Sequence, residues 1–141
     1  MNIVKISILA ITLILSLVTT YLGSAQVLQA KTIDQIELKT LQIEIDRLSV
    51  KYDIASSTVN RIIQCESKMY GGAENHNLDK NGKTWSIDKG WLQINSYFHT
   101  LPMSKLGLDI NDKWDSLEYG FMLMDKQGFQ PWSASKKCWL I

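Results

Sequence analysis

Hydrophobic positions along the chain predict a series of short helices. In residues 33–48 a helical period of apolar residues dominates, although residues 41–46 also alternate as in a strand. Residues 32–35 have the spacing of a capping box, so we expect this helix to begin at Thr32. We interpret it as a spacer or an added helix. The apolar residues on its predicted inner face are Ile33, Ile36, Leu41, Ile45 and Leu48.

A second helix is predicted from residue 56 to about residue 66. Either Ser56 or Ser57 can cap its N-terminus. Its apolar positions are Val59, Ile62 and Ile63. The helix ends near Glu66, and a carboxylate at the end of an apolar helix meets little solvent, which favours its neutral form and raises its pKa.

Glycine and asparagine residues between positions 71 and 89 predict a small irregular hairpin. Asn81-Gly82 is the strongest turn signal in the chain. From Gly90 onward the helical pattern returns, and we expect interruptions at Pro102 and Gly107.

The last predicted helix runs from residue 114 to about residue 126 and ends at Gly128. A short aromatic segment then begins at Pro131. These elements predict one α+β domain that is mostly α, with a small β-hairpin.

The first 25 residues have the features of a signal peptide. Lys5 precedes the apolar run Ile6–Leu22, and Gly23-Ser24-Ala25 supplies small residues for cleavage after Ala25. The alternative is an uncleaved anchor, which would be short for a membrane span. Both interpretations predict export, either as a secreted protein or into the cell envelope or periplasm.

Charge excludes one class of partner. Removing Lys5 from the 15 basic residues leaves 14, equal to the 14 acidic ones, so residues 26–141 are formally neutral. This balance gives no basic face for nucleic acid. In an exported chain Cys65 and Cys138 are expected to form a disulfide, and the alternative is a pair of buried thiols.

Four short motifs occur in a specific order. Residues 62–67 end in Cys65-Glu66-Ser67, and residues 73–77 read Ala-Glu-Asn-His-Asn. Residues 88–95 read Asp-Lys-Gly-Trp-Leu-Gln-Ile-Asn, and residues 128–132 read Gly-Phe-Gln-Pro-Trp. Together they resemble the lysozyme-like superfamily of lysozymes and lytic transglycosylases, over residues 52–139. The resemblance implies a lysozyme-like catalytic domain in residues 51–141, after a signal segment 1–25 and a helical spacer 26–50.

The resemblance also implies roles for single residues. Glu66 matches the general acid and Asp88 matches the second carboxylate, in a mechanism for which lysozyme is the type case. Asn77 matches a residue that supports Asp88, and Gly90 permits a tight backbone turn. The residues expected to line the cleft or bind sugar are Ser67, Asn77, Gly90, Trp91, Gln93, Asn95, Tyr119 and Trp132. The alternative for the aromatic ones is that they fill the core.

The resulting prediction is a glycosidase that cleaves peptidoglycan between N-acetylmuramic acid and N-acetylglucosamine. The short signal-bearing chain and the Glu66-Ser67 context favour lytic transglycosylation over hydrolysis. Asp88 does not decide between the two, because it matches a residue found in both kinds of enzyme. The alternatives are a non-catalytic glycan-binding module and a membrane-anchored structural protein. We expect a monomer without cofactor, whose partners are glycan strands, and membrane contact only if the N-terminal segment is uncleaved.

The sequence does not favour a metal site. Residues 77–88 follow the spacing of a calcium loop, but Asn77 and Asp88 replace the usual first and last ligands. The interval between them is also longer than in animal-type lysozymes, and it fits a hairpin better. His76 and His99 are too far apart in sequence to indicate a zinc site without further ligands.

Overall fold

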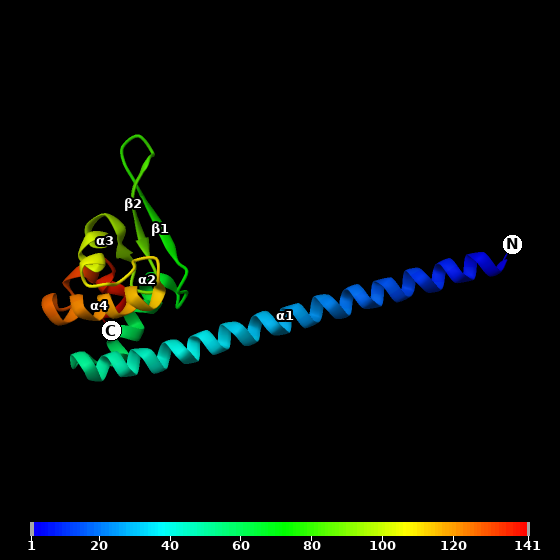
Figure 1. The fold of residues 1–141 in the computed structure, drawn as a ribbon, viewed down its shortest axis with the longest axis horizontal. Helices are drawn as coiled ribbons and strands as arrows, with labels where there is room; N and C mark the ends of the chain where they lie inside the picture. The colour runs from blue at the N-terminus through cyan, green and yellow to red at the C-terminus, as the bar shows by residue number, and fades with distance from the viewer. Residues whose placement is uncertain (1, 141) are drawn as a thin grey trace. The chain divides into compact units, whose positions relative to one another are not determined.

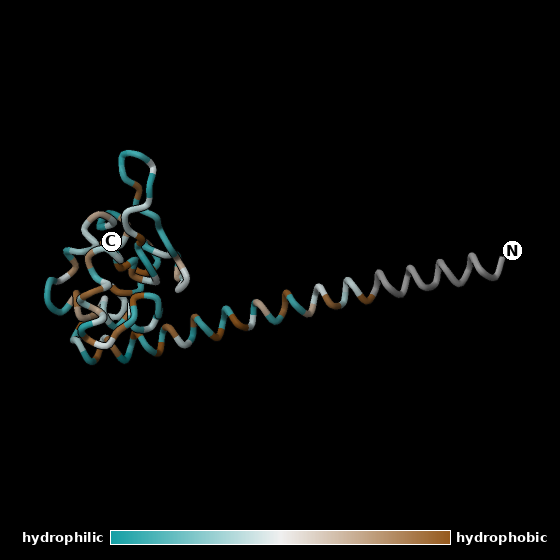
Figure 2. Tube along the Cα trace, turned by 45° about the horizontal axis from the view of Figure 1, so that its top comes forward, coloured by the Kyte–Doolittle hydropathy of each residue, from teal (hydrophilic) through white to brown (hydrophobic). Residues whose placement is uncertain are grey.

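The computed structural model describes the backbone of residues 2–140 and the side chains of residues 18–140. The chain divides into two compact units, residues 1–41 and residues 42–141 (Figure 1). Helix α1 (Asn2–Tyr52) makes up the whole described part of the first unit and continues into the second. Along the part of the first unit whose side chains are described, hydrophobic and hydrophilic residues follow one another around the helix (Figure 2).

The predicted start of the first helix is wrong. α1 is already helical at residue 2, and Thr32 lies within it, where its hydroxyl donates to the carbonyl oxygen of Leu28 at 2.9 Å. A threonine that bonds back to the preceding turn belongs to a helix interior, and does not cap an N-terminus. Ile33 and Ile36 are exposed, whereas Ile45 and Leu48 are buried in the second unit. The predicted inner face is therefore realised only at its C-terminal end.

Of the predicted apolar run Ile6–Leu22, residues 6–17 lie outside the described side chains, whereas Val18, Tyr21 and Leu22 are exposed. Among the described residues, no helix combines the length and the hydropathy that a membrane crossing requires.

Helix α2 (Ser56–Ser67) confirms the second predicted helix. Val59, Ile62 and Ile63 are fully buried, because their spacing places them on one side of the helix. Ala55 takes the N-cap position and makes no side-chain hydrogen bond, so the expected serine cap is wrong. The helix ends at Lys68, which adopts a left-handed conformation.

A small antiparallel sheet follows in the order β1-β2-β3, formed by β1 (Glu74–Leu78), β2 (Thr84–Lys89) and β3 (Ile94–Asn95). The predicted hairpin is thus confirmed. In its turn Gly82 has a φ of 78°, and Asp79 accepts hydrogen bonds from two backbone N–H groups. Its tip is hydrophilic (Figure 2).

The hairpin excludes an EF-hand, because residues 77–78 and 84–88 are paired strands with no helix on either side. No group of three or more His, Cys, Asp or Glu side chains in the part of the chain with described side chains is arranged to hold a metal ion.

Helix α3 (Ser96–Lys105) begins directly after β3. Asn95 caps it by accepting hydrogen bonds from the N–H groups of Tyr97 and Phe98. Pro102 lies inside the helix, so the interruption expected at this residue is wrong. The interruption at Gly107 is confirmed, since that residue has a φ of 76° just beyond the helix end.

Helix α4 (Lys113–Gln127) confirms the last predicted helix. Asp112 caps its N-terminus, and Gly128 ends it with a φ of 62°. The chain then turns through the 3-10 helix η1 (Gln130–Ser135) into α5 (Lys136–Trp139). The predicted disulfide between Cys65 and Cys138 is present and joins α2 to α5. The described chain is therefore a mostly helical α+β protein with a small antiparallel sheet.

Candidate functional site

Both candidate carboxylates line one cavity of about 240 Å³. The cavity lies where the end of α2 meets the sheet, the helices α3 and α4, and η1. Its lining residues are Glu66, Asp88, Leu92, Gln93, Ile94, Asn95, His99, Leu123, Pro131, Trp132 and Ala134. Residues that are far apart in sequence thus form a polar cavity with an apolar wall.

Glu66 lies in the last turn of α2 and is half-buried. The hydroxyl of Ser135 donates to its Oε1 at 2.5 Å. Burial raises the pKa of Glu66, the Ser135 hydrogen bond lowers it, and the negative charge of Asp88 raises it further. The net direction is upward, which confirms the raised pKa predicted from the helix pattern. Glu66 therefore keeps its proton to a higher pH than an exposed glutamate.

Asp88 is held by Asn95, because the two residues are paired directly across β2 and β3. The amide nitrogen of Asn95 donates to Asp88 Oδ1 at 2.7 Å and to the hydroxyl of Ser86 at 3.0 Å. Its amide oxygen caps α3. Asn95 thus lines the cavity, but both the nitrogen and the oxygen of its side-chain amide already form hydrogen bonds within the protein.

The expected support of Asp88 by Asn77 is wrong. In the register of β1 and β2, Asp88 is paired with Asn75, whereas Asn77 is paired with Ser86. The amide of Asn77 accordingly donates to the Ser86 hydroxyl at 3.0 Å. Asn77 reaches the carboxylate only indirectly, through the Ser86 hydroxyl that it shares with Asn95.

Gly90 and Gln93 shape the turn below the cavity. Gly90 has a φ of 73°, and its N–H donates to the carbonyl oxygen of Ala73 at 2.9 Å. The predicted tight turn at this glycine is confirmed. The side-chain amide of Gln93 donates to the carbonyl oxygens of Gly90 and Ala73. Gln93 therefore fixes the turn while it lines the cavity.

Trp91 and Tyr119 fill the core, so they offer no exposed face to a sugar ring. Trp91 is 1% exposed, and its indole N–H donates to the carbonyl oxygen of Met69. Tyr119 is buried with its hydroxyl 3.1 Å from Nδ1 of His99. The alternative role of core packing holds for both residues, and neither of them lines the cavity.

Trp132 and Ser67 are also buried, with different outcomes. Trp132 lines the cavity, and its indole N–H donates to the carbonyl oxygen of Leu92 at 2.8 Å. Ser67 donates to the carbonyl oxygen of Ile63 and does not line the cavity. Substrate contact by Ser67 is therefore not supported, because its hydroxyl faces its own helix.

Two polar residues of the site were not assigned roles from the sequence. Ser135 was missed because it lies 69 residues after Glu66, and nothing local links the two. His99 lines the cavity, where burial lowers its pKa and favours the neutral imidazole at neutral pH. The sequence signal for His99 was its position, four residues or about one helical turn after Asn95 on α3.

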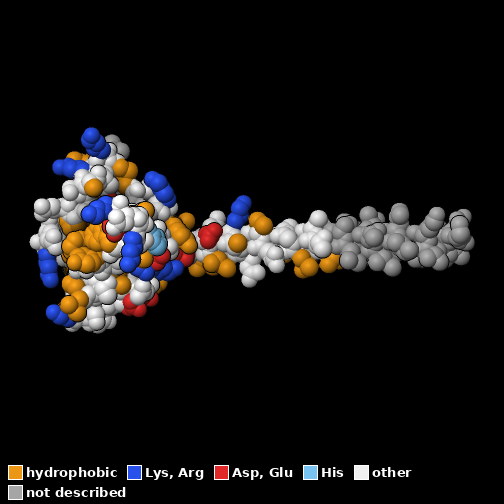
Figure 3. Space-filling view, turned by 90° about the horizontal axis from the view of Figure 1, so that it is seen from above, with side chains coloured by type: hydrophobic (Ala, Val, Ile, Leu, Met, Phe, Trp, Pro, Cys, Tyr) orange, Lys and Arg blue, Asp and Glu red, His pale blue; other side chains and the backbone are white. Residues whose placement is uncertain are grey.

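An exposed aromatic cluster was missed as well. Trp85 on β2 lies 5.4 Å from Tyr97 and 6.2 Å from Phe98 between ring centroids, and both partners belong to α3. The three side chains are between 47% and 69% exposed. Hydrophobic side chains also gather at the surface of the second unit in Figure 3. An aromatic residue within the polar hairpin was the signal in the sequence.

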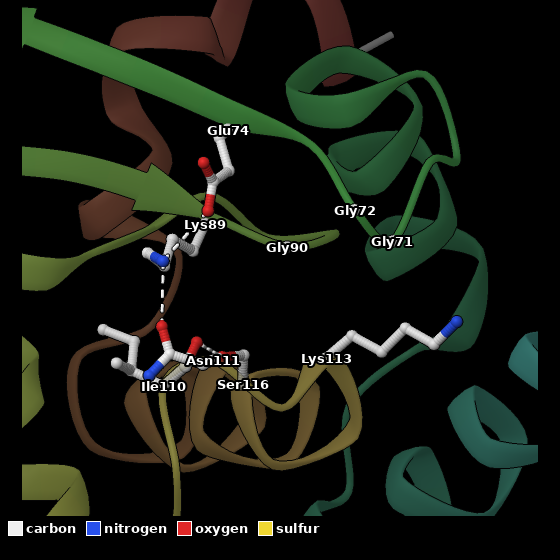
Figure 4. Close-up of a pocket in the computed structure, with 9 residues that line it drawn as sticks. All are labelled: Gly71, Gly72, Glu74, Lys89, Gly90, Ile110, Asn111, Lys113 and Ser116. Atoms are coloured by element: carbon white, nitrogen blue, oxygen red, sulfur yellow. Dashed lines mark hydrogen bonds and ion pairs between the residues drawn. The ribbon is translucent and has the colours of Figure 1, made fainter.

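A second, smaller cavity of about 170 Å³ adjoins the other side of β2 (Figure 4). Alternation along β2 places Asp88 in the first cavity and Lys89 in the second. Lys89 donates to Glu74 Oε1 and to Asn111 Oδ1, both at 2.9 Å. These bonds tie the end of β2 to β1 and to the loop before α4, so they stabilise the strand that carries Asp88.

Comparison with known proteins gave no match to any family model and none to any curated protein sequence.

Proposed function

We propose that this chain is a peptidoglycan-cleaving enzyme with a lysozyme-like fold. The observation that carries the proposal is the shared cavity of Glu66 and Asp88, in which Glu66 has a raised pKa and Asp88 is held by Asn95. Glycosidic cleavage requires an acid that protonates the leaving oxygen, and a second carboxylate beside it can stabilise the positive charge on the sugar. The order of the four sequence motifs supports the same conclusion.

In the proposed reaction Glu66 gives its proton to the glycosidic oxygen as the bond to the anomeric carbon breaks. Asp88 faces the positive charge that develops on the sugar. In lytic transglycosylation, which we favour, the C6 hydroxyl of the muramic residue then attacks the anomeric carbon. Its proton returns to Glu66, so the product has a 1,6-anhydro ring and no water is consumed.

The exposed cluster of Trp85, Tyr97 and Phe98 is the proposed sugar platform in place of Trp91 and Tyr119. Aromatic faces suit the apolar faces of pyranose rings, provided that the aromatic faces are accessible. Tyr97 and Phe98 lie two and three residues after Asn95, in the first turn of α3, and Asn95 lines the cavity. The position favours an extended, polymeric substrate.

An exported location is part of the proposal. The disulfide between Cys65 and Cys138 supports it, because such bonds persist in oxidising compartments and are rare where glutathione keeps thiols reduced. The expected signal segment supports the same placement, which also brings the enzyme to peptidoglycan.

The test is mass spectrometry of the muropeptides released when the full chain is incubated with purified peptidoglycan. We expect 1,6-anhydro ends, which are one water lighter than hydrolytic ends. Glu66→Gln should abolish release while the circular dichroism spectrum stays unchanged. Reducing N-acetylmuramic ends would instead indicate a lysozyme and give Asp88 a larger role. Folded wild-type protein that releases no fragment would refute the proposal.

Asp88→Asn distinguishes the two chemistries independently. Asparagine can keep the hydrogen bond to Asn95 but carries no charge. If water attacks a sugar stabilised by Asp88, the variant should lose at least about 100-fold in kcat, whereas a transglycosylase that depends mainly on Glu66 should lose far less.

A further inference from the structure

We propose that Ser135 is a positioning residue for Glu66 and that the Cys65–Cys138 disulfide is the strap that holds the two residues together. The role of Glu66 as an acid rests on the proposed function, whereas the positioning itself rests on the geometry alone. Ser135 belongs to neither the sequence motifs nor the cavity lining. It acts through Glu66 and touches no substrate.

The first step is the hydrogen bond itself. The Ser135 hydroxyl lies 2.5 Å from Glu66 Oε1 and 3.2 Å from the carbonyl oxygen of Trp132. One hydroxyl proton cannot serve both acceptors fully, and the shorter distance assigns it to the carboxylate. Glu66 Oε2 has no hydrogen bond to any described residue. The serine therefore distinguishes the two oxygens and leaves Oε2 to exchange a proton with a substrate.

The second step concerns the two protonation states that Glu66 must adopt in turn. As an acid it loses its proton in a half-buried site, where burial and Asp88 both disfavour the ionised form. The hydroxyl of Ser135 donates to that ionised form and thus stabilises it. When Glu66 is protonated, Ser135 can turn its proton to the carbonyl oxygen of Trp132. A donor with an alternative acceptor suits both states.

The third observation is the position of the Cys65–Cys138 disulfide relative to Glu66 and Ser135. Cys65 immediately precedes Glu66, and Cys138 follows Ser135 by three residues. In the same C-terminal segment, the indole N–H of Trp132 donates to the carbonyl oxygen of Leu92, and that of Trp139 donates to the carbonyl oxygen of Trp132. These hold the rings, whereas the covalent bond ties the backbone next to Ser135 to the backbone next to Glu66. Breaking it should loosen the Ser135 contact before it disrupts the core.

The test is a ¹³C NMR titration of the Glu66 carboxyl in the full chain, with Glu66→Gln used only to assign the signal. Asp88 on β2 and His99 on α3 are the other titratable groups that line the cavity. In Ser135→Ala the pKa of Glu66 should rise, because its ionised form loses a donor. Ser135→Thr keeps the hydroxyl and should restore the wild-type titration. An unchanged titration in folded Ser135→Ala would overturn the positioning role.

Ser133→Ala is the matched control, because Ser133 is an exposed residue of the same 3-10 helix and does not line the cavity. Its Glu66 titration should equal that of the wild type. A shift as large as that of Ser135→Ala would mean that any serine loss in η1 perturbs the site. That result would also contradict the specific role of Ser135.

The role of the disulfide is tested with the double variant Cys65→Ala and Cys138→Ala, in the same NMR pH titration of Glu66. All samples contain sulfate, which keeps the variant folded. The pKa of Glu66 should move in the same direction as in Ser135→Ala, and adding Ser135→Ala should move it little further. A folded pair that titrates like the wild type would overturn the strap.

Activity measurements distinguish a failure of the positioning role from a failure of the proposed function. On peptidoglycan Ser135→Ala should lower kcat about tenfold and leave KM within about twofold, because the change affects the reacting group and not the glycan contacts. An inactive wild type whose Glu66 titration still responds to Ser135 would reject the proposed function and support the positioning.

Discussion

Removing the disulfide should lower the free energy of unfolding of the second unit by about 4 kcal/mol. The bridge joins Cys65 to Cys138 across a sequence separation of 73 residues. For a loop of this length the chain-entropy model gives about 15 cal/mol/K, which at 25 °C corresponds to about 4.4 kcal/mol. The proposed change is Cys65→Ala together with Cys138→Ala.

The folded state should add little to this loss. Cys138 is exposed and Cys65 is partly exposed, so removing their sulfur atoms leaves no large cavity. Trp139 in the same short helix remains buried, and its N–H donates to the carbonyl oxygen of Trp132 at 3.0 Å. The effect should therefore arise mainly in the unfolded chain, which gains conformational freedom without the bridge.

Urea unfolding followed by tryptophan fluorescence is the appropriate assay. All five tryptophans of the chain lie in the second unit, so the signal does not report on residues 1–41. The alanine pair should show a lower midpoint and a larger m-value, because its unfolded state is more expanded. Wild-type protein in a reducing agent should behave like the pair. A loss below about 1 kcal/mol would refute the reasoning from loop closure.

Three further predictions follow from single contacts. Glu66→Gln should raise the melting temperature at pH 7.5, because ionising a group with a raised folded pKa opposes folding. The gain should vanish as the pH falls below the pKa of unfolded glutamate, near 4.3, and a gain that persists there would contradict the assignment. Gly120→Ala should lower the free energy of unfolding measured in urea, because the new Cβ would lie 2.2 Å from Leu92 Cδ1. The overpacking should cost about 1–3 kcal/mol, and the higher helix propensity of alanine should offset up to about 1 kcal/mol of it. A stabilised variant would show that Leu92 can move. Trp85→Ala should weaken cosedimentation with peptidoglycan about tenfold with unchanged stability, whereas the exposed Tyr70→Ala should not.

Local patterns were sufficient to predict most elements of the second unit. The sequence shows the apolar spacing of α2 and α4, the glycines that follow α3 and α4, and the Asn81-Gly82 turn. Each of these signals acts within a few residues. The long α1 was not predicted because a capping pattern at residues 32–35 does not start a helix when the preceding residues are helical too. A cap is informative only where a helix can begin.

The contacts of the site depend on information that is not local. Asn77 is expected to support Asp88 because it has the right type and order, but the register of β1 places it opposite Ser86, two residues from Asp88, and Asn95 on β3 makes the contact. Ser135 reaches Glu66 through the return of the chain along η1 and the disulfide. Trp91 stands in the middle of the motif, yet its side chain packs beside Gly71 and Trp114, away from the cavity.

The motif of residues 88–95 therefore has a different meaning in the structure from the one that its resemblance implies. Gly90 makes the turn, Gln93 bonds back to that turn, and Asn95 both caps α3 and holds Asp88. These hydrogen bonds already use the amide nitrogens that were expected to bind sugars. The motif thus builds the frame that presents Asp88 opposite Glu66. In the proposed function, recognition of a glycan would therefore depend on side chains whose surfaces remain open, such as the exposed aromatic cluster of Trp85, Tyr97 and Phe98.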